Sequence, residues 1–116
     1  MWCMVPESVT SQLRRGVLEF CVMALLRDDE RYGFELVQML REAEGFLTSE
    51  GTIYPMLARL RRDGRVATTW RESTSGPPRR YYRLTQAGSA ALDAFALEWE
   101  RFRDGVDLFL QRSWHA

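Results

Sequence analysis

The sequence predicts a mainly α-helical α+β domain with one small β-hairpin and a long C-terminal helix. Three segments before residue 64 carry apolar residues at helical spacing. Two β-prone segments with a Gly- and Pro-containing connection follow, and the last 30 or so residues return to a helical pattern. With 116 residues, of which 46% are hydrophobic, the chain has the size and composition of a single globular domain.

The first predicted helix covers residues 9–27, which are rich in apolar residues and contain no proline. Its apolar residues at helical spacing are Leu13, Val17, Phe20, Cys21, Ala24 and Leu25. Three acidic residues, 28–30, then interrupt the pattern. The second predicted helix covers residues 32–43 and ends near Gly45. Its apolar face consists of Phe34, Leu36, Val37 and Leu40.

The third predicted helix ends at about Asp63, and Gly64 supplies the left-handed residue that stops it. Thr48 and Ser49 offer hydroxyl groups for its N-terminal cap. Because proline is tolerated only in the first turn of a helix, Pro55 predicts a start as late as Thr52. The apolar face of this helix consists of Ile53, Met56, Leu57 and Leu60.

Two strands are predicted at residues 66–72 and 79–84, joined by a long polar tip at residues 73–78. Thr85 then caps a last helix that continues to about Leu110. Three helices followed by a hairpin is the order of the winged helix-turn-helix. We therefore expect an N-terminal extension (1–12), a winged-helix domain (13–85), and a C-terminal dimerisation helix with a short tail (86–116).

The charges of the chain are balanced overall but concentrated locally. There are 16 basic residues, all arginine, and 16 acidic ones. Between residues 49 and 88, however, eight arginines face only three acidic residues. Such a local positive segment is expected for a surface that binds phosphates. A codon bias that favours arginine over lysine would also explain the absence of lysine.

The third helix has an exposed face that suits a DNA groove. Small residues and one arginine lie opposite its apolar stripe: Gly51, Pro55, Ala58 and Arg62. Thr52 and Arg59 flank this strip on one side, and Tyr54 and Arg61 on the other. Such a face can approach the floor of the major groove, although a solvated helix face would have a similar composition.

The second strand of the hairpin begins with two arginines, Arg79 and Arg80, directly after Pro77 and Pro78. A wing would present these guanidinium groups to backbone phosphates or to the minor groove. The alternative is that both arginines only keep an edge strand soluble while Tyr82 and Leu84 face the core.

Several spaced blocks of the chain resemble the PadR-like transcriptional regulators. They are YGFEL at residues 32–36, SEGTIYPMLARL at 49–60, GPPRRYYRLT at 76–85 and AG at 87–88. The resemblance implies a winged-helix repressor of an inverted-repeat site in double-stranded DNA, which dimerises through its last helix and responds to a small molecule. The family's DNA-contacting positions correspond to Ser49, Thr52, Tyr54 and Arg59 in the helix and to Arg79 and Arg80 in the wing.

The last helix carries a seam of apolar residues at alternating spacings of three and four. Its members are Leu92, Phe95, Trp99, Phe102, Val106 and Phe109. This spacing is typical of a helix that packs lengthwise on another, and it predicts a homodimer, with packing onto its own domain as the alternative.

By the family resemblance, Trp99 stacks on flat aromatic effectors, with Phe95 and Phe102 beside it. The alternative for Trp99 is a simple core anchor.

The sequence offers no chemistry for an enzyme, a metal site or a cofactor. Cys3, Cys21 and His115 cannot supply the four ligands of an ordinary zinc site. No nucleophile motif or phosphate-binding glycine loop is present. No apolar run approaches a membrane span and no leader pattern is seen, so we expect a cytoplasmic location.

The competing functional hypothesis is a winged-helix protein-interaction module that does not read DNA sequence.

Overall fold

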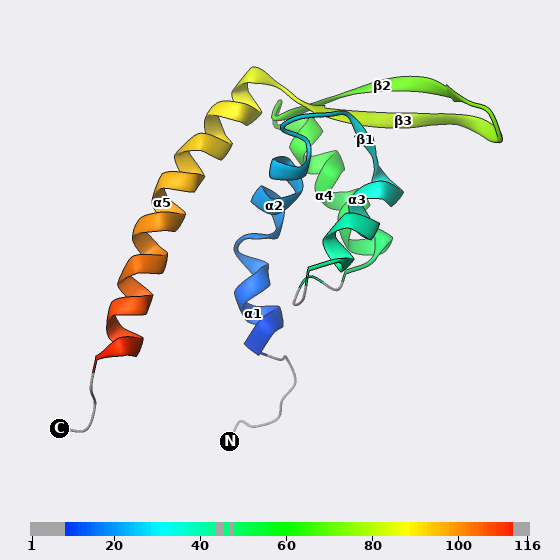
Figure 1. The fold of residues 1–116 in the computed structure, drawn as a ribbon. Helices are drawn as coiled ribbons and strands as arrows, with labels where there is room; N and C mark the ends of the chain where they lie inside the picture. The colour runs from blue at the N-terminus through cyan, green and yellow to red at the C-terminus, as the bar shows by residue number, and fades with distance from the viewer. Residues whose placement is uncertain (1–8, 44–45, 47, 113–116) are drawn as a thin grey trace.

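The computed structural model describes residues 9–43, 46 and 48–112. In chain order its elements are α1 (Val9–Arg15), α2 (Leu18–Leu25), β1 (Arg31–Tyr32), α3 (Gly33–Arg41), α4 (Glu50–Arg62), β2 (Val66–Ser73), β3 (Gly76–Leu84) and α5 (Gln86–Gln111). Figure 1 shows a body of short helices from which two arms extend, the β2–β3 hairpin and α5. The mainly helical α+β class is confirmed.

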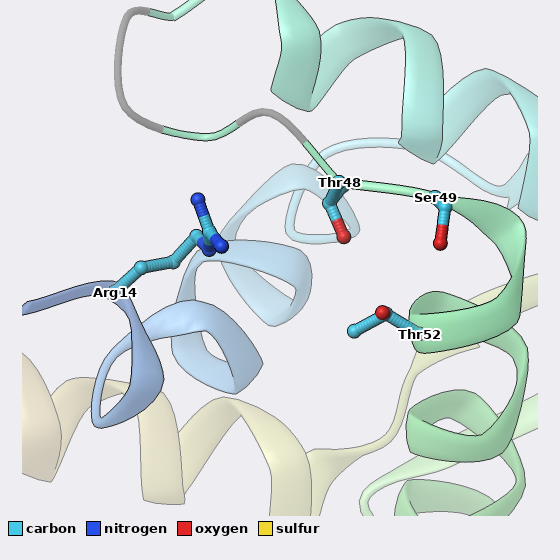
Figure 2. Close-up of a pocket in the computed structure, with 4 residues that line it drawn as sticks. All are labelled: Arg14, Thr48, Ser49 and Thr52. Carbon is cyan, nitrogen blue, oxygen red and sulfur yellow. The ribbon is translucent and has the colours of Figure 1, made fainter. Parts of the chain in front are cut away.

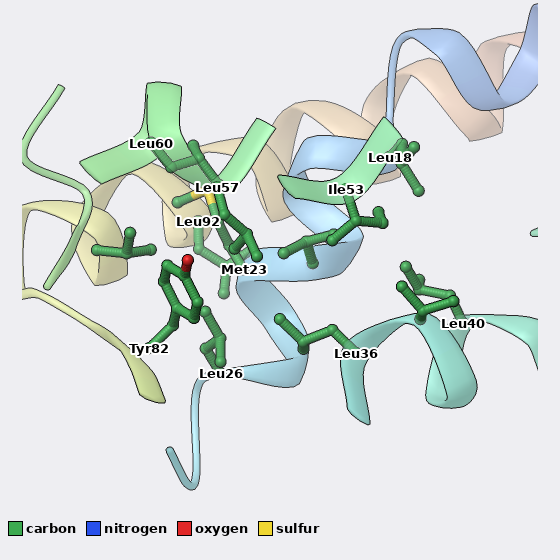
Figure 3. Close-up of a cluster of buried hydrophobic side chains, with 13 residues drawn as sticks. Leu18, Met23, Leu26, Leu36, Leu40, Ile53, Leu57, Leu60, Tyr82 and Leu92 are labelled. Carbon is green, nitrogen blue, oxygen red and sulfur yellow. The ribbon is translucent and has the colours of Figure 1, made fainter. Parts of the chain in front are cut away.

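The hydrophobic core gathers around α2, which contacts α3 and α5. Met23 from α2, Leu36 from α3 and Leu57 from α4 are completely buried (Figure 3). The strands add Val66 and Tyr82, and α5 adds Leu92. Burying each of these side chains contributes about 1.5–3 kcal/mol. This core is what holds α4 in place and leaves its opposite face free.

The first predicted helix is in fact two helices, and its predicted apolar face was only partly right: Phe20, Cys21 and Leu25 pack against the core at its edge but are not its most buried residues. The break falls at Gly16, a residue that is unfavourable in helix interiors, and the Val17 N–H donates to the Arg14 carbonyl at 3.0 Å. The deeply buried residues of this region are Leu18, Val22, Met23 and Leu26, while Leu13 and Ala24 are exposed. Almost every residue from 18 to 26 is apolar, so spacing alone could not identify the buried side.

The sheet has three strands rather than the two predicted. The short strand β1 pairs with β3, so that Tyr32 lies opposite Tyr81, and the strand order is β1-β3-β2. The hairpin strands also run further than predicted, with only residues 74–75 left in the turn. Proline has no N–H group to donate to a neighbouring strand. Pro77 and Pro78 are tolerated inside β3 because β1 pairs with β3 further along, at Tyr81 and Tyr82, and because the register with β2 is irregular beside the two prolines.

Helix α4 begins at Glu50, two residues earlier than predicted. The N–H groups of Thr52 and Ile53 both donate to the Ser49 carbonyl at 3.0 Å, which closes the first turn. Pro55 therefore lies in the second turn. Its missing N–H leaves the Gly51 carbonyl without a helical partner, and the exposure of Gly51 lets water satisfy that group.

The end of α4 is joined tightly to the start of α5. Gly64 has a left-handed φ of 79°, as predicted, and the Arg65 N–H donates to the Leu60 carbonyl at 2.9 Å. The Thr85 hydroxyl donates to the Gly64 carbonyl at 2.7 Å and accepts from the Gly88 N–H at 3.0 Å. The Thr85 N–H donates to the Arg65 carbonyl at 3.1 Å. We call residues 64–65 and 85–88 the α4–α5 joint.

Beyond its first turns, α5 extends away from the body (Figure 1). The Cα radius of gyration is 17.2 Å, compared with about 13 Å for a compact domain of this length. Leu92, an expected interface residue, is instead buried in the core of its own chain. Among the described residues, no helix is both long and apolar enough to cross a membrane.

The joint gives a test of the fold. A methyl group added at Gly88 would collide with the backbone carbonyl of Arg65, which cannot move without opening the joint. Gly88→Ala should therefore lower the free energy of unfolding by about 1–3 kcal/mol, measured by urea denaturation. Gly105→Ala is the matched control, because Gly105 lies in the same helix with open space around it and should be neutral or stabilising. Equal effects of the two substitutions would contradict the role of the joint.

Candidate nucleic-acid interface

The exposed side of α4 is the one predicted from the sequence. Ile53, Leu57 and Leu60 are fully buried. The strip opposite them is exposed and consists of Gly51, Pro55, Ala58 and Arg62. We call this set the open strip. Because its first three members are small, another surface can come close to the α4 backbone along it.

A hollow lies at the N-terminal end of the open strip. It is lined by Arg14 from α1, by Thr48 and Ser49 just before α4, and by Thr52 in its first turn. Figure 2 shows the three hydroxyl-bearing side chains facing the same space as the Arg14 side chain. The sequence predicted Ser49 and Thr52 for this surface but not Arg14, because nothing in the spacing brings α1 to the start of α4.

A second hollow lies beside the C-terminal half of α4. Ala58, Arg61 and Arg62 line it from the helix, and Arg80 and Tyr82 line it from β3. Three guanidinium groups are therefore gathered between the helix and the hairpin. The sequence predicted Arg62 and Arg80 as binding residues, whereas Arg61 was placed only on the flank of the helix.

The two hairpin arginines point to opposite faces of the sheet, as successive residues of a strand must. Arg80 lies on the same face as Tyr82, toward α4, with its guanidinium 5.0 Å from the Trp70 ring centroid. Arg79 lies on the other face, 4.5 Å from the centre of the Tyr32 ring. Arg80 therefore joins the arginines of α4, whereas Arg79 lies on the opposite face of the sheet, and the contact of each with DNA stays a prediction.

The outer face of the hairpin holds its arginines against tyrosines. Arg71, which pairs with Arg79 across the strands, lies 4.4 Å from the centre of the Tyr81 ring. Its guanidinium also pairs with Glu30 at 3.6 Å. These contacts lie in the half of the hairpin nearer its turn, and they pair the charge of Arg71 within the protein.

Tyr54 is fixed by a close approach to α3. Its ring lies so near Gly33 that any β-carbon there would collide with it, which explains why glycine follows Tyr32. Burial, followed by the negative charge of Glu50, raises the pKa of the Tyr54 hydroxyl above its ordinary value. Like any tyrosine hydroxyl at neutral pH, it can both donate and accept a hydrogen bond.

Arg59, a predicted base-reading residue, does not project freely from α4. Its Nη2 donates to Glu19 Oε1 in α2. Arg65 Nη1 lies 3.4 Å from Glu19 Oε2. The Arg59 side chain is still about half exposed, so part of its guanidinium is open to the surface.

A row of aromatic rings runs along α5. Phe95 stacks on Phe20 of α2, with ring centroids 4.2 Å apart and an angle of 3° between the rings. Trp99 follows at 6.4 Å from Phe95, and Phe102 at 6.5 Å from Trp99. From Trp99 onward the predicted seam is open: Trp99, Phe102, Val106 and Phe109 are between 39% and 67% exposed. Phe20 was missed as a member of this row because it lies 75 residues away in the sequence.

The described residues hold no group of three or more histidine, cysteine, aspartate or glutamate side chains that could bind a metal ion. Cys21 packs against the core as predicted, and burial raises the pKa of its thiol. Cys3 and His115 lie outside the described residues.

Comparisons with known proteins agree with this architecture. Residues 22–94 match the family described as Transcriptional regulator PadR-like family. A transcriptional regulator of Mycobacterium tuberculosis is 38% identical over 89 residues, which cover 75% of this chain and 81% of the relative.

Solved structures give the same result. A PadR-like transcriptional regulator from Bacillus cereus is 34% identical, with a TM-score of 0.81 over 88% of this chain and 99% of the other. A PadR family transcriptional regulator from Eggerthella lenta is 35% identical, with a TM-score of 0.79 over 89% of each chain. These proteins are regulators of transcription and not enzymes. The chain therefore belongs to the PadR-like family of DNA-binding transcriptional regulators.

Proposed function

We propose that this regulator binds double-stranded DNA by inserting the open strip of α4 into the major groove, with the β2–β3 hairpin along the neighbouring backbone. The observation that carries the proposal is the hollow in which Arg61 and Arg62 of α4 meet Arg80 of β3, directly beside the strip. Small residues allow close approach to the groove floor, and guanidinium groups beside them suit phosphates and guanine edges.

In this arrangement the first turn of α4 contributes polar contacts. Ser49 and Thr52 reach a phosphate or a base edge through their hydroxyls, and Tyr54 does so through a hydroxyl that stays protonated. Arg62 reaches into the groove from the open strip. Arg80 binds a backbone phosphate, whereas Arg79 contributes mainly through the general positive field of the hairpin.

The second part of the proposal is a homodimer that forms along α5. Trp99, Phe102, Val106 and Phe109 form an apolar seam that the described part of the chain leaves open. A second copy of the same helix has the matching spacing and would cover it. Two symmetry-related α4 helices would then read an inverted repeat, with half-sites about 34 Å apart.

The third part is regulation by a small aromatic or hydrophobic effector. Trp99 lies in the middle of the seam, with Phe95 and Phe102 beside it, so a flat molecule could stack between the two protomers. Its insertion would change the spacing of the α4 helices and release the DNA. In this proposal the protein is a repressor, and the effector relieves the repression. The proposal puts the protein in the cytoplasm, because a repressor has to reach chromosomal DNA.

The opposite orientation of the hairpin arginines gives the first test. Arg80→Ala should weaken binding to every duplex and reduce the slope of log affinity against log salt by about 0.9, the value for one lost phosphate contact. Arg79→Ala is the matched control and should change the slope much less. Fluorescence anisotropy on a labelled duplex over a range of salt concentrations measures both. Equal slopes for Arg80→Ala and the parent would remove β3 from the interface.

The dimer is tested on the exposed seam. Phe102→Asp would place an unpaired carboxylate in an apolar interface and should weaken the dimer by about 2 kcal/mol or more. Leu97→Asp is the control, since Leu97 is also apolar and is 58% exposed, compared with 67% for Phe102, but lies off the seam. Analytical ultracentrifugation gives the dissociation constants. A parent protein that sediments as a monomer at all concentrations would contradict the proposal.

The effector site is tested with planar aromatic dyes. Trp99→Ala should weaken dye binding by at least about 0.5–1.5 kcal/mol, the contribution of one aromatic stack. Dye fluorescence titration measures the affinity, and ultracentrifugation shows that the variant is still a dimer. Unchanged dye affinity in a dimeric Trp99→Ala protein would mean that Trp99 only fills the interface.

A further inference from the structure

Glu19 is the acidic residue in contact with the basic flank of α4. It lies in the first turn of α2, and its carboxylate is shared between two arginines, Arg59 within α4 and Arg65 just after it. Its side chain is 26% exposed, so its carboxylate is better shielded from solvent than the carboxylates that pair with Arg27 and Arg71, which are 67% and 32% exposed. A carboxylate beside a phosphate-binding surface lowers general affinity for DNA. We therefore expect Glu19 to provide a benefit that offsets this loss of general affinity.

The ion pair with Glu19 holds the Arg59 side chain in one orientation. A guanidinium group has five N–H donors, and Glu19 accepts from one terminal nitrogen of Arg59. The remaining donors stay available on a side chain that is about half exposed. An unrestrained arginine loses much rotamer freedom when it binds a base, and a side chain held beforehand has less to lose.

Resting on the proposed DNA-binding function, we infer that Glu19 is a positioning residue for sequence discrimination. It orients Arg59 toward one base of the site. Carboxylates in other proteins orient the histidine side chains of metal sites in the same way. Glu19 does not touch the DNA itself. Its negative charge lowers affinity for all sequences, while the orientation of Arg59 favours the correct one.

The test separates these two effects. A duplex selected by the parent protein from a randomised pool serves as the specific site, and a scrambled duplex of the same composition as the reference. Arg59→Ala should reduce the ratio of the two affinities by about five- to a hundredfold, as for one lost arginine–base contact. Glu19→Gln should reduce the same ratio by at least about threefold, within the range for residues that share contacts. Its affinity for the scrambled duplex should stay equal or rise.

A double-mutant cycle assigns the effect to Arg59. In the Arg59→Ala background, Glu19→Gln should no longer change the affinity ratio. Arg65→Gln is the matched control, because it removes the other partner of Glu19 and should leave the ratio unchanged. Asp93→Asn is the charge control, because it neutralises an acidic residue in the ion pair with Arg27, whose side chains are more exposed.

Three results would overturn the inference. The first is an unchanged affinity ratio in Glu19→Gln. The second is an equal loss of affinity on both duplexes together with a lower melting temperature, which would show that Glu19 only stabilises the fold. The third is the same change of ratio with and without Arg59. If the parent selects no duplex from the pool, the proposed DNA-binding function itself fails, and that outcome is distinct from the other three.

Discussion

The α4–α5 joint fixes the geometry on which the other functional features depend. Thr85 caps α5 and at the same time bonds to the last turn region of α4, through its hydroxyl at Gly64 and its N–H at Arg65. Gly88 allows the two backbones to come this close. The helix that carries the open strip and the helix that carries the apolar seam are therefore joined directly, by one side-chain and one backbone hydrogen bond from Thr85. Their relative direction is a property of the fold.

Helix α2 makes a second connection between the same two elements. Two consecutive residues perform it, since Glu19 holds the α4 flank and Phe20 stacks on Phe95 of α5. The aromatic row from Phe20 to Phe102 thus begins inside the body and ends on the open seam. One short helix therefore contacts both the arginines of the α4 flank and the start of the aromatic row on α5.

Much of this structure could be predicted from the sequence, because the relevant signals are local. The left-handed stop at Gly64, the cap at Thr85 and the apolar face of α4 all depend on residues within a few positions of each other. The missed features depend on distant contacts. The pairing of β1 with β3, the approach of Arg14 to Thr52 and the ion pair of Glu19 with Arg59 join segments that spacing rules cannot connect. The strand alternation that separates Arg79 from Arg80 was a local signal, because both residues were already placed in the predicted strand at residues 79–84.

The shallow attachment of α5 has a mechanical consequence. The helix packs on the body through its first turns, where Leu92 is buried and Phe95 stacks on Phe20, and its 26 residues extend over about 39 Å. A rotation of about 5° at the joint would sweep its far end through about 3 Å, roughly the thickness of an aromatic ring. The attached part of the helix is therefore short, and the part that extends beyond it is long. Small angular changes near Gly88 therefore become large displacements at Phe109. In the proposed dimer, a molecule that separated the far ends of the two helices by one ring thickness would turn each body by only a few degrees.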